Sequence, residues 1–332
     1  MTATLTTAWP ASAATCRGSL DQLKQRLAGL LQVLPVDRPI VYLDYPVYLN
    51  FGDLLIMRGT EHFCAAHGHT VLGRFACMNF LARARRRIDN QTILVLQGGG
   101  NFGDLYPVHQ NFREEIVRGF PDNRIVVLPQ SVHFSSPAEL ERSARTFSRH
   151  RDLILCVRDH ESLSQVHGRF TQNTLLMPDM AHQLWRGGLP LRGIESRTLR
   201  LLRADREAAQ HQQWTAMEQP SMDWLGFIPR WQCRVFGRLL WLHNAEGRSG
   251  YEWGARALWY RYCEMLHQRM EERFLEYSDI TTSRLHGMIF SLLLGIRVRY
   301  LDNSYGKLGN YANTWFDTSV PAVPHLSGAP AD

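Results

Sequence analysis

A segment near the C-terminal end of the chain carries an arginine and a histidine where an anion could bind. Residues 281–287 have the sequence TTSRLHG, and the apolar residues that follow them recur at helical spacing. Ser283 is the predicted N-cap, which places Arg284 and His286 in the first turn. A helix N-terminus binds anions and disfavours cations unless an anion compensates them. The pattern therefore favours an anion site with His286 as general acid, and a purely structural histidine is the alternative.

Two more cationic side chains follow predicted strands. Arg158 follows the apolar run 153–157, and Lys307 lies beyond the run 298–301. In open α/β sheets, ligands bind outside the carboxyl ends of the strands. Arg158 is thus a candidate contact for an anionic ligand, and Lys307 could add positive charge. The alternatives are a surface arginine paired with Asp159 or Glu161 and a solvated loop lysine.

The glycine-rich segment 97–104, QGGGNFGD, follows the apolar run 93–96 and contains a GxGxxG pattern. In a dinucleotide site this pattern opens a helix, and an acidic residue ends the next strand. The next run, 125–128, is followed by proline and glutamine instead. NAD or flavin binding is therefore not favoured. A tight turn for close helix packing, or a turn that lets a substrate approach the backbone, remains open.

The tetrapeptide NFGD occurs twice, at 50–53 and at 101–104, each time at a predicted strand-to-helix junction. Asn50 and Asp53 suit a helix N-terminus, and Gly52 frees the backbone. Two equivalent junctions predict neighbouring loops at one cleft edge. The candidate cleft residues are Asn50, Gly52, Asp53, Gly98, Gly99, Gly100, Asn101 and Asp104.

Short apolar runs separated by helix-like stretches indicate the elements that would position these residues. Runs at 40–43, 93–96, 125–128 and 153–157 are rich in Ile, Leu and Val. Such strands, alternating with helices, predict an α/β fold with parallel sheets covered on both faces.

We expect two Rossmann-like domains that face a cleft. Residues 1–35 form an N-terminal extension with an amphipathic helix at 20–34, which Pro35 closes. Residues 36–188 form the N-terminal α/β domain, and residues 197–325 form a C-terminal α/β domain with the donor-binding helix terminus. No structure is predicted for 208–255.

The composition limits the class of protein. The 332 residues are 45% hydrophobic and 20% charged, which is typical of a globular protein. No apolar stretch could span a bilayer, and the N-terminus lacks the features of a secretory signal. Six scattered cysteines favour reduced thiols in the cytoplasm, without disulfides or a structural zinc. The net charge of +6 favours an anionic substrate or membrane surface, while no nucleic-acid-binding signature occurs.

Several segments together resemble the polysaccharide pyruvyl transferases, in the branch found in bacterial exopolysaccharide gene clusters. They occur in the order of that family and span roughly residues 40–310. The matching segments are NFGDLLIMRGTEHF (50–63), LQGGGNFGDLYPVHQNFREEIV (96–117), LPQSVHF (128–134), VRDHES (157–162), PDMAH (178–182), RADRE (203–207) and TTSRLHG (281–287).

This resemblance implies a fold similar to the GT-B glycosyltransferases. It also implies transfer of the enolpyruvyl carbons of phosphoenolpyruvate to two hydroxyls of a sugar in an exopolysaccharide repeat unit, which gives a pyruvate ketal and phosphate. The family's phosphoenolpyruvate-binding residues fall on Arg158, Arg284 and Leu285, and its essential histidine falls on His286. Neither a cofactor nor a metal is expected.

A lipid-linked oligosaccharide acceptor at the inner face of the plasma membrane would suit the positive charge. Two alternatives remain: a GT-B glycosyltransferase that uses a nucleotide sugar, and a non-catalytic glycan-binding subunit.

Overall fold

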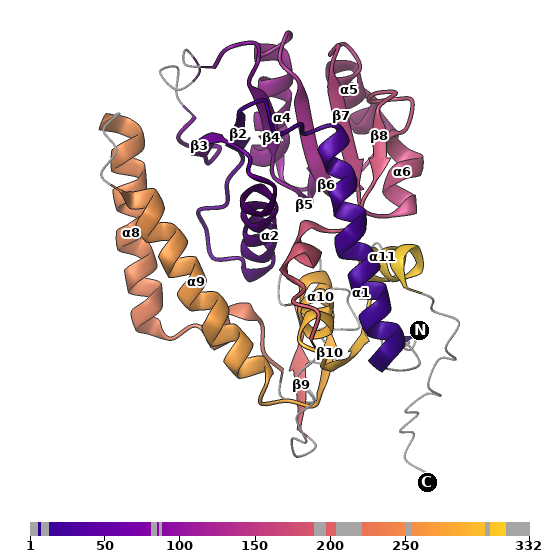
Figure 1. The fold of residues 1–332 in the computed structure, drawn as a ribbon, viewed down its shortest axis with the longest axis vertical. Helices are drawn as coiled ribbons and strands as arrows, with labels where there is room; N and C mark the ends of the chain where they lie inside the picture. Colours follow the sequence, from indigo (N-terminus) through magenta and orange to yellow (C-terminus); the bar gives the residue numbers. More distant parts are fainter. Residues whose placement is uncertain are drawn as a thin grey trace. The chain divides into compact units, whose positions relative to one another are not determined.

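The computed structural model describes residues 6–7, 13–80, 85, 88–188, 197–203, 221–249, 254–302 and 306–316 (Figure 1). The chain divides into two compact units. Unit 1 comprises Met1–Asp21, Arg186–Phe227 and Arg269–Asp332, and unit 2 comprises Gln22–Trp185 and Ile228–Gln268. Each unit contains a largely parallel sheet, so the predicted α/β class is confirmed.

Unit 2 contains the larger sheet, and all its strand pairs are parallel. Its order is β3-β2-β4-β6-β7-β8, with β5 paired to β6. The strands are β2 (Ile40–Leu43), β3 (Val71–Phe75), β4 (Ile93–Leu96), β5 (Gly99–Gly103), β6 (Ile125–His133), β7 (Leu153–Val157) and β8 (Thr174–Leu176). Three of the four predicted runs match strands residue for residue. The fourth, 125–128, continues to His133 because β5 pairs with its extension.

Helices cover both faces of this sheet, as the continuous apolar strands predicted. Along β2, Ile40 and Tyr42 pack into one core, while Val41 and Leu43 pack into the other. The helical elements that contribute to the first core include α1 (Ala13–Leu27), η1 (Ala28–Gln32), α2 (Phe51–His67) and α9 (Ala255–Phe274). The second core includes residues of α4 (Pro107–Gly119), α5 (Pro137–Phe147) and α6 (His160–Val166). Because the strands of this sheet are all parallel, their carboxyl ends meet at one edge of the sheet.

The stretch 208–255, left without a prediction, contains α8 (Arg230–Ser249). Its residues 208–220 and 250–253 lie outside the described ones. Helix α9 is fixed within unit 2 by a 3.0 Å hydrogen bond from Trp259 Nε1 to the carbonyl oxygen of Pro46. Residues 228–268 thus group with unit 2, whereas the sequence-based boundaries assign them to the domain 197–325.

Unit 1 contains a smaller sheet in the order β1-β11-β10-β9, in which only β1 is antiparallel to its neighbour. Its elements are β1 (Thr6–Thr7), β9 (Thr198–Leu201), η3 (Trp224–Phe227), β10 (Asp279–Thr282), α10 (Leu285–Leu293), β11 (Arg297–Tyr300) and α11 (Lys307–Trp315). The helix predicted from the apolar spacing after Ser283 is α10, which runs from Leu285 to Leu293. The helix predicted at 20–34 is instead the end of α1 followed by the 3-10 turn η1.

The glycine-rich segment does not open a helix. It forms β5, and α4 begins only at Pro107. Gly103 has φ 127°, and a Cβ there would lie 1.7 Å from the carbonyl oxygen of His133. These glycines therefore let two strands pair closely. No helix begins directly after the GxGxxG pattern, so the helix N-terminus that a dinucleotide needs is not found there.

None of the described helices is long and apolar enough to cross a membrane. Within the dense basic run 83–87, the structure describes only Arg85, which pairs with Glu115 at 2.6 Å.

Candidate functional site

The N-terminus of α10 in unit 1 has no side-chain cap. The structure places Arg284 at the N-cap, so the prediction that Ser283 caps the helix is wrong. Ser283 Oγ instead accepts a 2.9 Å bond from the backbone N–H of Arg203, which joins it to the loop after β9. His286 lies in the first helical turn as predicted, and its side chain is half-buried. The partial positive charge of this terminus is not offset by a capping oxygen.

Asp223 orients the guanidinium of Arg284. Arg284 Nε donates to Asp223 Oδ1 at 2.9 Å, and Nη2 donates to Oδ2. The two side chains are 14% and 22% exposed, so the pair is accessible at the surface of unit 1. Sequence reasoning missed Asp223 because it lies in the stretch 208–255, where no element was predicted.

Gly287 lets α10 approach the sheet of unit 1. A Cβ at this position would lie 2.5 Å from Thr282 Oγ1 and 2.7 Å from Leu201 Cδ2, so only glycine fits. Leu285 is buried. Lys307 is the first residue of α11 and is 8% exposed, so the alternative of a solvated loop lysine is wrong.

Arg158 in unit 2 follows β7 as predicted, but its guanidinium is fully buried. Its Nη1 lies 2.5 Å from Asp179 Oδ2, and its Nε donates to Ser131 Oγ at 2.9 Å. Asp159, one of the neighbouring carboxylates, instead caps α6 through a 2.7 Å bond from the N–H of Ser162. The partner of Arg158 is Asp179, from the PDMAH segment that the family resemblance includes.

The first NFGD segment caps α2 as predicted. Asn50 Oδ1 accepts from the N–H of Gly52 at 3.2 Å, and Asn50 Nδ2 donates to Asp53 Oδ2 at 2.7 Å. A Cβ built on Gly99 would lie 3.4 Å from Asp53 Oδ1. The first NFGD segment is therefore a close neighbour of the glycine-rich segment, as the sequence indicated.

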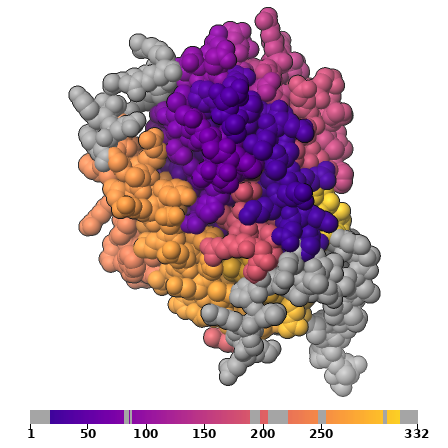
Figure 2. Space-filling model, in the orientation of Figure 1, coloured from indigo at the N-terminus to yellow at the C-terminus, as the bar shows by residue number. Residues whose placement is uncertain are grey.

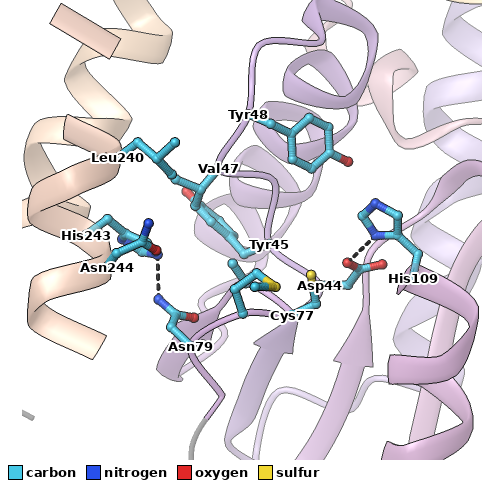
Figure 3. Close-up of a pocket in the computed structure, with 12 residues that line it drawn as sticks. Asp44, Tyr45, Val47, Tyr48, Cys77, Asn79, His109, Leu240, His243 and Asn244 are labelled. Atoms are coloured by element: carbon cyan, nitrogen blue, oxygen red, sulfur yellow. Dashed lines mark hydrogen bonds and ion pairs between the residues drawn. The ribbon is translucent and has the colours of Figure 1, made fainter. Parts of the chain in front are cut away.

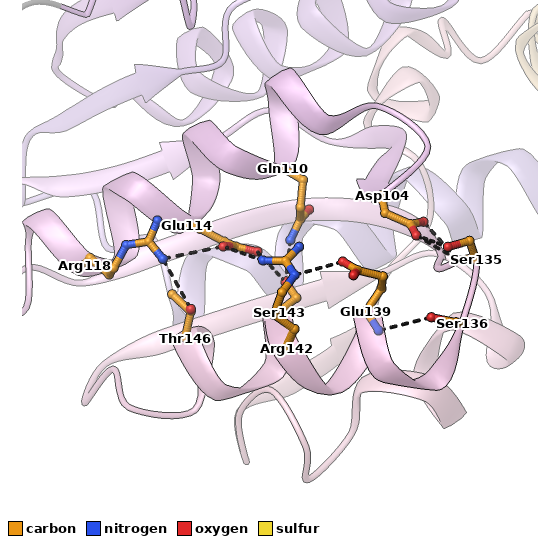
Figure 4. Close-up of polar contacts among 10 residues, drawn as sticks. All are labelled: Asp104, Gln110, Glu114, Arg118, Ser135, Ser136, Glu139, Arg142, Ser143 and Thr146. Carbon is orange, nitrogen blue, oxygen red and sulfur yellow. Dashed lines mark hydrogen bonds and ion pairs between the residues drawn. The ribbon is translucent and has the colours of Figure 1, made fainter.

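The second NFGD segment ends β5. Arg113 Nη1 donates to the carbonyl oxygen of Asn101 at 2.9 Å, and Nη2 donates to its Oδ1. Asp104 accepts from the N–H of Ser135 at 2.9 Å and from its hydroxyl (Figure 4). Gly98 lies against β6, since a Cβ there would be 2.9 Å from the carbonyl oxygen of Pro129, and Gly100 is partly exposed. Asn101 and Asp104 therefore have structural partners within unit 2.

Unit 2 has a pocket of about 470 Å³ beside the carboxyl ends of β2 and β3 (Figure 3). The pocket is lined by Asp44, Tyr45, Val47, Tyr48, Ala76, Cys77, Met78, Asn79, His109, Leu240, His243 and Asn244. No residue of this set was predicted as a site residue. Asp44 could have been found, because it directly follows the run 40–43.

One end of the pocket carries a buried aspartate with two partners. Asp44 Oδ1 accepts from His109 Nδ1 at 2.7 Å, and Oδ2 accepts from Arg113 Nη2 at 3.0 Å. This contact fixes the tautomer of His109, and Figure 3 shows its other ring nitrogen turned away from Asp44. Burial lowers the pKa of Arg113, and the Asp44 carboxylate opposes that shift. Asp44 itself has φ 57°, an uncommon conformation for a residue with a side chain.

Three buried polar atoms of the lining residues have no hydrogen-bond partner within the described part of the chain: Tyr45 Oη, Asn79 Oδ1 and His243 Nδ1. Asn79 Nδ2 and His243 Nε2 lie 2.5 Å apart. Burial lowers the pKa of His243. Buried polar atoms of this kind usually have partners, and these three are shielded from solvent in this structure.

Asp44, Cys77 and His109 could hold a metal ion, since one ligand atom from each lies within 4.8 Å of the others. Carboxylate, thiolate and imidazole together suit zinc. Burial, followed by the Asp44 carboxylate, raises the pKa of the Cys77 thiol to about 11. Zinc binding would therefore have to remove the thiol proton of Cys77 and break the hydrogen bond between Asp44 and His109.

Comparisons with known proteins agree on one family. Residues 50–305 match the model of the polysaccharide pyruvyl transferases. EpsO of Bacillus subtilis, named as a candidate pyruvyl transferase, is 41% identical over 93% of this chain and 96% of its own length. Pyruvyl transferase 1 of Schizosaccharomyces pombe is 30% identical over 67% of this chain and 54% of its own.

A crystal structure of an uncharacterised Klebsiella pneumoniae protein has the same fold. Its TM-score is 0.57 at 19% identity, and the match covers 88% of this chain and 93% of the other.

Proposed function

Because this chain belongs to the polysaccharide pyruvyl transferase family and is a transferase, we propose that phosphoenolpyruvate is its donor. The pyruvyl group is transferred to two hydroxyls of a sugar in an exopolysaccharide repeat unit, which forms a pyruvate ketal and releases phosphate. The observation that carries this proposal is the N-terminus of α10, which has no side-chain cap and presents Arg284 and His286. An anionic donor supplies the negative charge that this arrangement favours.

Arg284 binds the donor through its guanidinium, which can contact a phosphate or a carboxylate with two parallel N–H bonds. Asp223 holds the guanidinium plane in place beforehand, so less side-chain entropy is lost on binding. Leu285 and Lys307 contribute an apolar contact and further positive charge.

Arg158 is a proposed donor ligand because it matches the family motif. Its guanidinium is fully buried, so contact with the donor requires its bonds to Asp179 and Ser131 to loosen.

His286 acts as general acid on the methylene carbon C3 of the donor. Protonation of C3 leaves an electrophilic C2, to which one sugar hydroxyl adds. The C–O bond to phosphate breaks, and the second hydroxyl adds to C2. The two hydroxyl protons balance the reaction: one replaces the proton that His286 gave to C3, and the other leaves with phosphate.

The acceptor sugar binds in the pocket of unit 2. A volume of about 470 Å³ accommodates a sugar ring with its substituents. Tyr45 and Tyr48 offer aromatic surface. The unpartnered atoms of Tyr45, Asn79 and His243 suit a ligand rich in hydroxyls once the lining side chains move to expose them. His109, oriented by Asp44, offers a further polar contact to the sugar.

Thermal-shift titration tests the donor. A ligand that binds only the native state raises the melting temperature. Phosphoenolpyruvate should stabilise the wild type, and UDP-glucose and NAD should not. Arg284→Ala should abolish the shift and Arg158→Ala should reduce or abolish it, whereas Arg273→Ala is the matched control with an exposed arginine.

Turnover is tested by mass spectrometry with phosphoenolpyruvate and a panel of aryl glycosides. We expect a product that carries a pyruvyl ketal and the release of one phosphate per ketal. His286→Ala should lose turnover by at least about a hundredfold, the typical contribution of a general acid. A shift with UDP-glucose alone would instead indicate a nucleotide-sugar glycosyltransferase.

A further inference from the structure

One side of α8 presents tryptophans and arginines to solvent. Arg230, Trp231, Arg234, Arg238 and Trp241 are all exposed, Trp231 by 48% and Trp241 by 66%. Their spacing is i, i+1, i+4, i+8 and i+11, which places them within an arc of about 100° on an ideal helix. We call these five residues the α8 face. Figure 2 shows α8 and α9 at the molecular surface, in orange.

The exposed charged side chains that the structure describes in this region are all positive. At the described positions of 228–246 and 254–268, four arginines are exposed, because Arg261 of α9 joins the three of the α8 face, and no aspartate or glutamate is exposed. None of the four arginines makes an ion pair with a described residue. Leu258 of α9 adds an apolar side chain that is 45% exposed.

Some exposed arginines of unit 2 have acidic partners, whereas Arg145, Arg149 and Arg151 are exposed and make no ion pair with a described residue. Arg142 pairs with Glu139 at 2.8 Å, and Arg169 lies 3.8 Å from Glu141. The α8 face differs because its unpaired arginines lie among exposed tryptophans. An anionic partner would complement the charge, and an apolar layer would take up the tryptophans.

We propose that the α8 face docks on an anionic lipid surface. Tryptophan prefers the boundary between lipid headgroups and acyl chains, where its ring is buried and its N–H stays hydrated. Arginine binds lipid phosphate while its aliphatic stem lies against apolar groups. A nucleic acid would not require the exposed tryptophans and Leu258 to be buried.

Docking through this face would hold the pocket near the lipid surface. The same helix lines the pocket with Leu240, His243 and Asn244, which lie outside the α8 face. An acceptor carried on a lipid would then have a short path to the pocket. This consequence rests on the proposed function, whereas the docking itself does not.

Co-sedimentation of the full chain with vesicles tests the docking. The vesicles are phosphatidylcholine alone or with about a third phosphatidylglycerol. We expect binding only to the anionic vesicles, weakened by salt. Each arginine near such a surface strengthens binding about fivefold, so the double variant Arg234→Glu and Arg238→Glu should weaken it by at least about 25-fold.

The matched control is Arg145→Glu with Arg149→Glu, which makes the same charge change at exposed positions of unit 2 away from α8. Trp231→Ala with Trp241→Ala should also weaken binding, without changing the net charge. Melting curves show whether each variant is folded.

Three results would overturn the proposal. The first is equal binding of the wild type to neutral and anionic vesicles. The second is an equal loss of binding in the control variant, and the third is full binding by the tryptophan variant. Self-association that is lost in the α8 variants, without lipid binding, would assign this face to a second copy of the chain. Because no assay step uses phosphoenolpyruvate, these results are independent of the proposed function.

Discussion

Asp44 and Arg113 form a buried ion pair with 3.0 Å between Oδ2 and Nη2. The side chains are 2% and 0% exposed, so neither charge is hydrated. Arg113 also donates to Asn101, and Asp44 also accepts from His109. One buried pair thus joins the end of β2, the end of β5 and helix α4, and it fixes the histidine that lines the pocket.

Arg113→Met should lower the free energy of unfolding by about 3–5 kcal/mol, because the Asp44 carboxylate would stay buried without its cation. Urea unfolding at neutral pH measures the change. Arg169→Met is the control, since Arg169 and Glu141 are 55% and 54% exposed and lie 3.8 Å apart. It should change stability by less than about 1 kcal/mol. An equal loss of unfolding free energy in the two variants would contradict the burial of the Asp44–Arg113 pair.

Gly287→Ala should disturb the start of α10. The new Cβ would meet Thr282 Oγ1, which now accepts from the N–H of Arg284 at 3.0 Å. We expect a loss of about 1–3 kcal/mol in unfolding free energy, typical of overpacking, and weaker phosphoenolpyruvate binding. Gly237→Ala in α8 is the matched control, because nothing lies within 4 Å of its Cβ. It should gain up to about 1 kcal/mol from helix propensity.

The strands of unit 2 could be predicted from the sequence because each is buried on both faces. Ile40–Leu43, Ile93–Leu96 and Leu153–Val157 are continuous apolar runs that packing on both sides requires. Arg158 and His286 were found by the same logic, as polar residues directly after a strand or at a helix start. The glycine-rich segment misled because its glycines serve strand pairing, which depends on the distant His133.

The pocket could not be predicted because α8 and its neighbours determine it. His243 and Leu240 reach it from a helix whose tryptophans and arginines face solvent, so its sequence lacks a clear apolar period. Asp223 and Asp179 orient the two arginines from 61 and 21 residues away in the sequence. Such pairings arise from tertiary structure, and the local spacing of residues in the sequence does not predict them.

Tyr45→Phe should separate ligand binding from stability. The Tyr45 hydroxyl is buried without a partner among the described residues, which costs about 1–3 kcal/mol in the free protein. Removing it should leave the unfolding free energy unchanged or higher. The substitution should also weaken acceptor binding. This would be seen as a higher KM for the best glycoside and an unchanged KM for phosphoenolpyruvate. A destabilised variant would show that the hydroxyl has a partner.

Acidification should destabilise the protein through His243. Burial lowers its native pKa below the ordinary value of 6.5. As the pH falls below about 6.5, the unfolded chain binds a proton that the native chain does not, so unfolding is favoured. This stability is complete above the unfolded pKa and is lost as the pH falls towards the native pKa. His243→Gln should therefore lose less unfolding free energy than the wild type between pH 7.5 and 5.5, measured by urea titration.

Zinc should bind the Asp44–Cys77–His109 cluster only weakly at neutral pH. The Cys77 thiol, with its pKa raised to about 11, must lose a proton before it can bind zinc. The apparent zinc affinity should therefore rise by up to about tenfold per pH unit between pH 7 and 9. Competition with a chromophoric chelator measures this for the wild type and Cys77→Ser, with Cys233→Ser as the exposed control. Zinc retained after dialysis against a chelator at pH 7, and lost in Cys77→Ser, would instead identify a resident metal. The pocket would then hold a metal where we propose the acceptor sugar.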